Sequence, residues 1–226
     1  MGRPAGGGGS HPSVDRASRR GSAAPARRTR ARKVIVVVDT SSARSALALL
    51  SPDGTVVAEE IHESGRDFDL PGRFRALAGD QTVTKVAVAV GPGSFTGLRV
   101  GVSFSLGLAI GLRVPIVTLR TLHIQAARSD DAVVAVAEAG RGRVYLLAPG
   151  AAPRLAEPAD LPRDLPIVGW LRPTTESALR AAGLHFQPDS ELRTFGNAAS
   201  LMLESAPEVA YGSLKLEYMQ VFSARA

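Results

Sequence analysis

The chain has 226 residues, of which 45% are hydrophobic, with 27 Lys and Arg, 21 Asp and Glu, and no cysteine. This length predicts one domain, or two small ones, with enough chain for a buried core. The absence of cysteine excludes disulfides, thiol nucleophiles and cysteine metal sites, and it favours a reducing cytoplasm as the compartment.

The net charge of +6 comes from the N-terminal segment. Residues 1–32 contain eight Arg and a single acidic residue, Asp15, whereas residues 33–226 contain 19 basic and 20 acidic residues. For residues 1–32, three interpretations remain open: a disordered tail or an overlong gene start, an organellar transit peptide, and a nucleic-acid-binding arm. The nearly neutral body has no bulk charge that favours a phosphate backbone, and no charge-free apolar run predicts a membrane span.

The first elements of the body are three predicted strands. Residues 34–38 are β-branched and apolar on both faces, which is typical of a central strand, and residues 45–50 and 55–61 follow as a meander. A helix over 68–78 and a covered strand over 83–90 come next. A helix over 95–111 completes the order β-β-β-α-β-α.

The elements after this helix are shorter. We predict a strand at 116–117, a helix over 121–128 and a hairpin around residues 140–142, whose strands are 132–137 and 144–147. Five prolines interrupt residues 149–166, and two further helices are expected at 176–182 and 194–204.

The most informative segment is a glycine-rich turn between the strand and the long helix. Its candidate site residues are Gly91, Pro92, Gly93, Ser94, Phe95, Thr96 and Arg99. A strand, a glycine turn and a helix N-terminus together can hold an anion. The dinucleotide fingerprint requires glycine where Thr96 stands, however, and a Walker loop requires lysine where Leu98 stands, so both motifs are disfavoured. Ser94 is expected to cap the helix.

The long helix carries two rows of small residues at four-residue spacing. One row is Gly97, Gly101, Ser105 and Ala109, and the other is Ser103, Gly107 and Gly111. Because each interior glycine costs about 1 kcal/mol relative to alanine, the helix is expected to gain the close approach of another backbone. That backbone belongs either to the sheet of its own domain or to a partner helix. For a partner helix, the expected interface is Gly97, Leu98, Gly101, Val102, Ser105, Leu108 and Ala109.

The run Gly-Pro-Gly-Ser-Phe-Thr-Gly-Leu-Arg, residues 91–99, resembles the signature of the TsaB family, bacterial partner proteins in the synthesis of tRNA threonylcarbamoyladenosine. Asp39-Thr40-Ser41 after the first strand resembles the family's opening hairpin. The run Gly142-Arg143-Val144-Tyr145 resembles its later Gly-x-Val-Tyr strand. The resemblance covers residues 34–148 well and the remainder weakly.

This resemblance implies an actin-like, Hsp70-like nucleotidase (ASKHA) α/β fold, with one well-formed half-domain and a second, smaller and degenerate one. The corresponding segments are a tail over 1–32, a first half-domain over 33–128 and a second over 129–226. By resemblance, the chain has no catalytic residue and docks on TsaD, which transfers the threonylcarbamoyl group to adenosine 37 of tRNA.

The resemblance also implies the ligands and the assembly. No cofactor is expected on the isolated chain, and ATP and a metal are expected on the TsaD-like partner subunit. A TsaE-like ATPase is a further expected partner, and tRNA is reached only through the complex. For the isolated chain, a monomer and a homodimer through the apolar seam of the long helix both remain open.

Three segments depart from the family pattern. They are Arg66 to Pro71, where a histidine-containing helix start is usual; Ala137 to Gly140, in place of Ile-Asp-Ala-Arg; and Tyr218-Met219-Gln220, in place of Tyr-Leu-Arg. These departures concern the geometry of pairing with the partner subunit. They remove no catalytic group, because none is assigned to the family.

Chemistry by the chain alone has little support in the sequence. The four histidines are isolated, which disfavours a metal site, and Ser94 lies in no Gly-x-Ser-x-Gly motif. Asp39 and Thr40 stand where a related kinase would bind nucleotide, but the glycine of a phosphate loop is absent, so we interpret them as a relic or a turn cap. The alternative function is an actin-like enzyme that binds a small ligand or nucleotide through Gly91 to Gly97.

Overall fold

The computed structural model describes residues 1–2, 31–65 and 68–219. Residues 3–30 lie outside this range, so the three interpretations of residues 1–32 stay predictions. Arg66, Asp67 and Gln220 of the departing segments also lie outside it. All the helices and strands of the described residues belong to the unit Ala31–Ala226.

A six-stranded sheet forms the first layer of this unit. Its strand order is β10-β5-β4-β1-β2-β3. Strand β1 pairs parallel with β4 and antiparallel with β2, and it has apolar residues buried on both faces because helices cover both. The bounds are β1 (Lys33–Asp39), β2 (Arg44–Leu50), β3 (Val56–Glu63), β4 (Thr82–Ala89), β5 (Ile116–Leu119) and β10 (Glu208–Val209).

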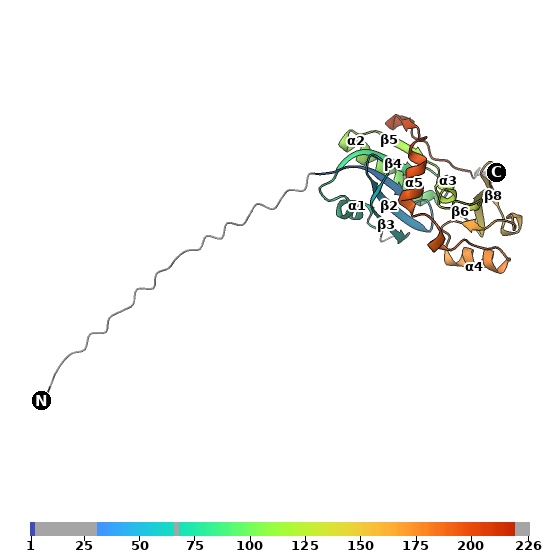
Figure 1. The fold of residues 1–226 in the computed structure, drawn as a ribbon, viewed down its shortest axis with the longest axis horizontal. Coiled ribbons are helices and arrows are strands. Elements are labelled where there is room, and N and C mark those ends of the chain that lie inside the picture. Colours follow the sequence, from blue (N-terminus) through green and yellow to red (C-terminus); the bar gives the residue numbers. More distant parts are fainter. Residues whose placement is uncertain (3–30, 66–67, 220–226) are drawn as a thin grey trace, which may run out of the picture. The chain divides into compact units, whose positions relative to one another are not determined.

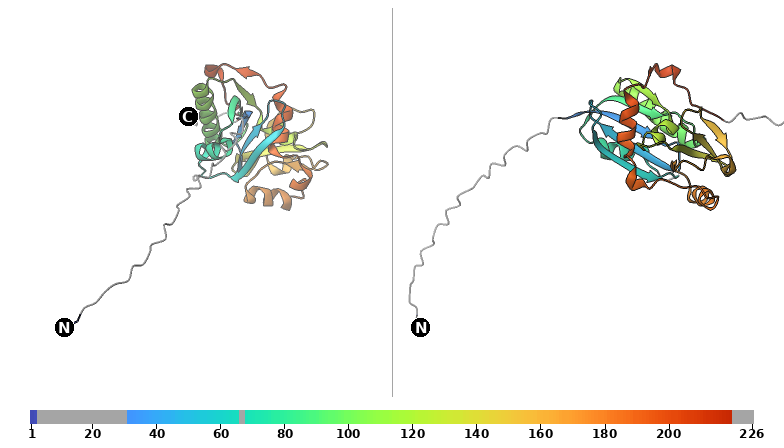
Figure 2. Two further views of the ribbon diagram at one scale, coloured as in Figure 1. Left: turned by 60° about the vertical axis from the view of Figure 1, so that its left-hand side comes forward. Right: turned by 45° about the vertical axis from the view of Figure 1, so that its right-hand side comes forward.

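Helices cover the two faces of this first sheet. Helices α1 (Leu70–Ala78) and α2 (Phe95–Leu112) lie on one face, and α3 (Thr121–Ala126) and α5 (Phe195–Leu203) lie on the other (Figures 1 and 2). Each face has its own apolar cluster. The first layer therefore consists of this sheet together with the helices on its two faces.

A second, four-stranded sheet has the order β8-β7-β6-β9. Helix α4 (Pro173–Ala181) packs on one of its faces and α3 on the other. Since Ile124 of α3 packs against the first sheet and Leu122 against the second, this short helix joins the two layers. The strands are β6 (Val134–Gly140), β7 (Arg143–Leu147), β8 (Arg154–Ala156) and β9 (Ile167–Val168).

The predicted order β-β-β-α-β-α is confirmed. Strands β8, β9 and β10 were not predicted, because strands of two or three residues are too short to show an alternating pattern. Along the chain, the second sheet follows α3, but α5 and β10 return to the first sheet. The division into half-domains 33–128 and 129–226 stays a prediction, and two elements of the second segment pack in the first layer.

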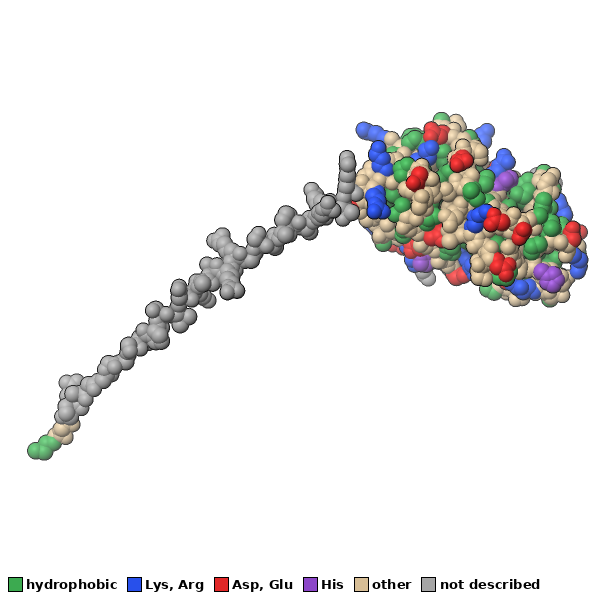
Figure 3. Space-filling view, in the orientation of Figure 1, with side chains coloured by type: hydrophobic (Ala, Val, Ile, Leu, Met, Phe, Trp, Pro, Cys, Tyr) green, Lys and Arg blue, Asp and Glu red, His purple; other side chains and the backbone are tan. Residues whose placement is uncertain are grey.

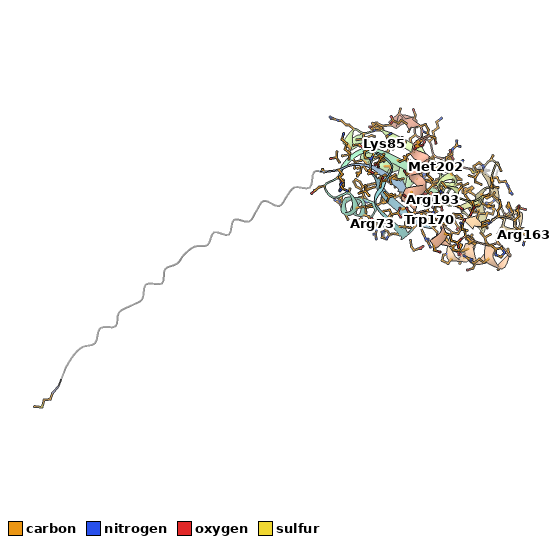
Figure 4. The ribbon with its side chains drawn as sticks, viewed as in Figure 1. Arg73, Lys85, Arg163, Trp170, Arg193 and Met202 are labelled. Atoms are coloured by element: carbon orange, nitrogen blue, oxygen red, sulfur yellow. The ribbon has the colours of Figure 1, made fainter. Side chains whose placement is uncertain are left out.

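Ionic contacts reinforce the junction between the two sheets. The side chain of Arg128 is 6% exposed, and its Nη2 donates to Asp189 at 3.0 Å. Its guanidinium also lies 5.0 Å from the ring of Trp170, and its Nε donates to the carbonyl of Arg193; both residues are labelled in Figure 4. Burial raises the pKa of Asp189, but hydrogen bonds from Arg128 and Arg44 outweigh it, so this pKa is below its usual value.

Candidate functional site

The glycine turn packs directly against the loop between β1 and β2. A Cβ atom at Gly93 would overlap the carbonyl oxygen of Ser41, and one at Gly97 would overlap the carbonyl oxygen of Thr40. Only glycine allows this approach of two backbones. The need for glycine at these two positions is therefore steric and internal to the chain.

The polar groups of the turn also bond within the chain. Ser94 N donates to Ser41 O at 2.6 Å, and Thr40 Oγ1 donates to Gly97 O at 2.7 Å. Ser94 Oγ accepts from Gly97 N at 3.3 Å, which is the predicted helix cap. The backbone N–H groups of Ser94 and Gly97 are thus bonded within the chain, whereas in an anion-binding turn such N–H groups point at the ligand.

Asp39 lies at the end of β1, beneath this loop, and is fully buried. Its Oδ1 accepts from Ser41 N at 2.8 Å and from Ser41 Oγ at 2.6 Å, whereas Oδ2 meets no donor among the described residues. Burial raises the pKa of Asp39, although the bonds from Ser41 act in the opposite direction. Asp39 therefore stabilises the β1–β2 loop through its two hydrogen bonds with Ser41.

A cavity of about 980 Å³ lies beside the turn. Segments of the first layer and of the second sheet both line it. Its lining consists of Thr40, Ser42, Ala43, Ser45, Glu63, Ser64, Gly65, Phe68, Ser94, Thr96, Gly97, Val100, Glu138, Arg172, Pro173 and Thr174. Thr40 thus faces the cavity, whereas Asp39 does not line it.

The charged residues of the cavity are two carboxylates, Glu63 and Glu138, and one cation, Arg172. Glu138 is 7% exposed and accepts from Arg172 N at 3.2 Å and from Thr175 Oγ1 at 2.8 Å. These bonds connect Glu138 of β6 to the N-terminal end of α4. The lining therefore has a net negative charge, which does not suit a polyphosphate.

Most of the interface residues predicted for α2 face the chain's own core. Leu98, Gly101, Val102, Ser105 and Ala109 are buried, and Gly97 and Leu108 are partly buried. The side chains of Leu98, Val102 and Ala109 are buried in the chain's own core, and Gly101 contacts Thr40. The prediction of this row as a partner surface is corrected: it is the row that meets its own domain.

The second row of small residues lies on the exposed face of α2. Ser103, Gly107 and Gly111 are exposed, and among the described residues nothing beyond the helix's own backbone lies within 4 Å of a Cβ placed at Gly107 or Gly111. Large apolar side chains are also exposed beside this row: Val100 is 46% and Ile110 49% exposed.

By length and composition α2 also resembles a membrane span, as core helices of soluble proteins do.

The C-terminal segment, residues 214–219, crosses the glycine turn. Leu214 and Leu216 pack on the core beneath α2, and Glu217 N donates to Val90 O at 2.9 Å. Met219 packs against the cluster between α3 and the second sheet. Within six residues, this segment thus contacts the apolar cluster between α2 and the first sheet, the glycine turn and the second sheet.

Sequence reasoning missed this segment and Glu138. The alternation of Leu214 and Leu216 is the available signal for the first, but it is too short to distinguish a packed segment from a loop. Glu138 stands alone in the apolar strand Val134–Gly140, and a solitary carboxylate there indicates a specific partner.

Among the described residues, no group of three His, Cys, Asp or Glu residues is arranged to hold a metal ion.

The two layered sheets, the covered parallel strands and the intervening cavity define an actin-like α/β chain. Solved structures agree with this class. YeaZ from Pseudomonas aeruginosa superposes with a TM-score of 0.61 at 21% identity, covering 82% of this chain and 99% of that one. A second structure, described as similar to peptidase YEAZ from the same organism, gives 0.58 at 20% identity, with 83% and 100% covered.

Curated sequences narrow this class. The chain is 35% identical over 121 residues to the tRNA threonylcarbamoyladenosine biosynthesis protein TsaB of Bacillus subtilis, covering 49% of this chain and 52% of that protein. It is 33% identical over 122 residues to TsaB of Escherichia coli, with the same coverage. The family model described as "TsaD: tRNA N6-adenosine threonylcarbamoyltransferase" matches residues 78–160. The resemblance to TsaB is thereby confirmed, and the chain spans about half the length of the curated relatives it matches.

The two faces of α2 predict opposite effects of inserting leucine. In Gly101→Leu the new side chain displaces Thr40 and disrupts its bond to Gly97, so the free energy of unfolding falls by about 1–3 kcal/mol. In Gly107→Leu nothing is displaced, and better helix propensity leaves the stability equal or about 0.5 kcal/mol higher. Urea unfolding followed by fluorescence of the buried Trp170 measures both, and equal losses contradict the assignment of the faces.

The buried Asp39 predicts a pH dependence of stability. Because its pKa is raised in the folded chain, the folded state holds the proton more tightly, and stability falls as pH rises from the unfolded value of 3.8 through the folded pKa. Asp39→Asn keeps an oxygen for Ser41 and removes the ionisation. We expect the variant to gain stability relative to the wild type as pH rises above 4. A difference that is constant between pH 4 and pH 8 contradicts this account.

Proposed function

We propose that the chain is a non-catalytic subunit in the synthesis of tRNA threonylcarbamoyladenosine, acting in the cytoplasm by docking on a TsaD-like catalytic subunit. The observation that carries the proposal is the exposed row of Ser103, Gly107 and Gly111 on α2. Small residues at four-residue spacing allow a second helix to approach closely, and the apolar neighbours supply area to bury.

The chemistry of the reaction belongs to the partner in this proposal. Ser94 serves as a helix cap, and Asp39 is buried beneath its loop. ATP and a metal are assigned to the TsaD-like subunit, and a TsaE-like ATPase joins the same complex. We propose that, in the absence of these partners, the exposed row of one copy packs on that of a second copy to form a homodimer.

The surface charge supports contact with tRNA through the complex only. Lys and Arg side chains are interspersed with Asp and Glu on the face of the described residues shown in Figure 3. Residues 33–226 contain 19 basic and 20 acidic residues. An RNA-binding surface concentrates positive charge, because phosphate contacts dominate the affinity.

A second candidate function is the binding of a small ligand or nucleotide in the cavity beside the turn. The volume of about 980 Å³ and the hydroxyl groups that line it favour a polar ligand, whereas the net negative charge of the lining counts against the polyphosphate of a nucleotide. Calorimetric titration of the isolated full chain with ATP separates the two functions. Saturable binding without a partner favours this second candidate.

Docking through the exposed row predicts a specific loss in Ser103→Leu. A leucine at this position holds the partner backbone away, and we expect the dissociation constant for the TsaD subunit of the same organism to rise at least about tenfold. Surface plasmon resonance with the full chain measures this constant. Ser177→Leu is the matched control, since Ser177 is also an exposed serine on a helix, and it leaves binding unchanged.

Two results would count against the proposal. If the wild-type chain does not bind the TsaD subunit at micromolar concentrations, the docking function fails. If it binds but Ser103→Leu and Ser177→Leu behave alike, the partner contacts another surface.

A further inference from the structure

We infer that Arg99 is the specificity-determining residue of the α2 surface and that it recognises an acidic side chain of the protein partner. This inference rests on the proposed docking function and deepens it, because it states what the partner must present. It follows from three features of Arg99: its isolation on the helix, its orientation and its surroundings.

Arg99 is the one charged residue in the 18-residue sequence of α2. It is exposed and stands one turn before Ser103 on the helix. Docking of a helix on this row therefore removes water from a guanidinium group. A buried cation without a partner strongly destabilises an interface, so a stable complex requires a carboxylate opposite Arg99.

The chain does not supply that carboxylate from its described residues. Ion pairs within 4.0 Å occupy seven arginines of the described residues, whereas Arg99, like the exposed Arg75, Arg113 and Arg141, has none. The seven are Arg44, Arg73, Arg120, Arg128, Arg143, Arg180 and Arg193. No acidic side chain of the described segments lies within this distance of Arg99. Its hydrogen-bond donors therefore remain for an anion brought by another molecule.

Aromatic contacts hold the guanidinium in place. Its Cζ lies 3.7 Å from the centroid of the Phe95 ring, and the Phe95 ring lies 5.4 Å from that of Tyr218. Stacking restricts a flexible side chain before binding, so less entropy is lost on contact. A planar guanidinium held by its face presents its edge, which is the geometry for two parallel bonds to a carboxylate.

The surroundings favour a protein carboxylate over an RNA phosphate. Beyond Arg99, the exposed face of α2 consists of small and apolar residues such as Val100, Ser103 and Ile110. A phosphate backbone is bound by several cations along its path, whereas a helix interface combines apolar contacts with a few charge pairs. The single cation in an apolar row matches the second pattern.

The test measures the binding of full-length variants to the TsaD subunit of the same organism. For Arg99→Ala we expect the dissociation constant to rise about 30-fold or more, and for Arg99→Lys by a smaller factor, because lysine keeps the charge but not the planar fork. Arg120→Ala is the matched control: Arg120 is also exposed but already pairs with Glu217 at 3.0 Å, and its loss changes binding less than twofold.

The salt dependence supplies a readout that a purely structural role would not change. The affinity of the wild type falls with rising NaCl, and this dependence is weaker for Arg99→Ala but not for Ser103→Leu. If Arg99→Ala binds like the wild type while Ser103→Leu does not, the inference is overturned and the proposed function stands. If Arg99→Ala weakens binding of a tRNA transcript by the isolated chain instead, RNA is the ligand and the inference is overturned. If the wild type does not bind TsaD, both fail.

Discussion

The structure depends on the close approach between the β1–β2 loop and the first turn of α2. Gly93 and Gly97 bring two backbones together, and Ser94 and Thr40 then close the contact with hydrogen bonds of 2.6 and 2.7 Å. A side chain at either glycine would meet a carbonyl oxygen. This contact sets the rotation of α2 about its axis, and the rotation decides which small residues meet the sheet and which face outward.

The rotation gives α2 two surfaces with different requirements. The row that begins at Gly97 and includes Gly101 is needed for folding, because Thr40 occupies the space beside it. The row of Ser103, Gly107 and Gly111 is equally small but exposed, and a side chain at Gly107 or Gly111 would meet nothing among the described residues. Helix propensity disfavours glycine at the exposed positions 107 and 111, and the proposed docking of a second backbone there gives a reason for their presence. The same reasoning assigns Arg99 to the partner, since its charge has no counterpart within the described chain.

Much of the fold follows from the sequence, and the site follows in part. The β-branched run 34–38 and the long apolar helix have strong periodic patterns, so their types and their order were predictable. The four-residue spacing of small residues also predicted close packing. It did not determine which of two rows faces inward, because that choice depends on the contact between Thr40 and Gly97, which are 57 residues apart. Likewise, the contacts of residues 214–219 depend on long-range packing that no local pattern encodes.

The most direct test of the central claim is the content of N6-threonylcarbamoyladenosine in bulk tRNA, measured by mass spectrometry in source cells depleted of this chain. The account predicts that the modified nucleoside is lost on depletion, restored by the wild-type chain and not restored by Ser103→Leu at equal protein abundance. Modification that persists at the wild-type level after depletion would contradict the account.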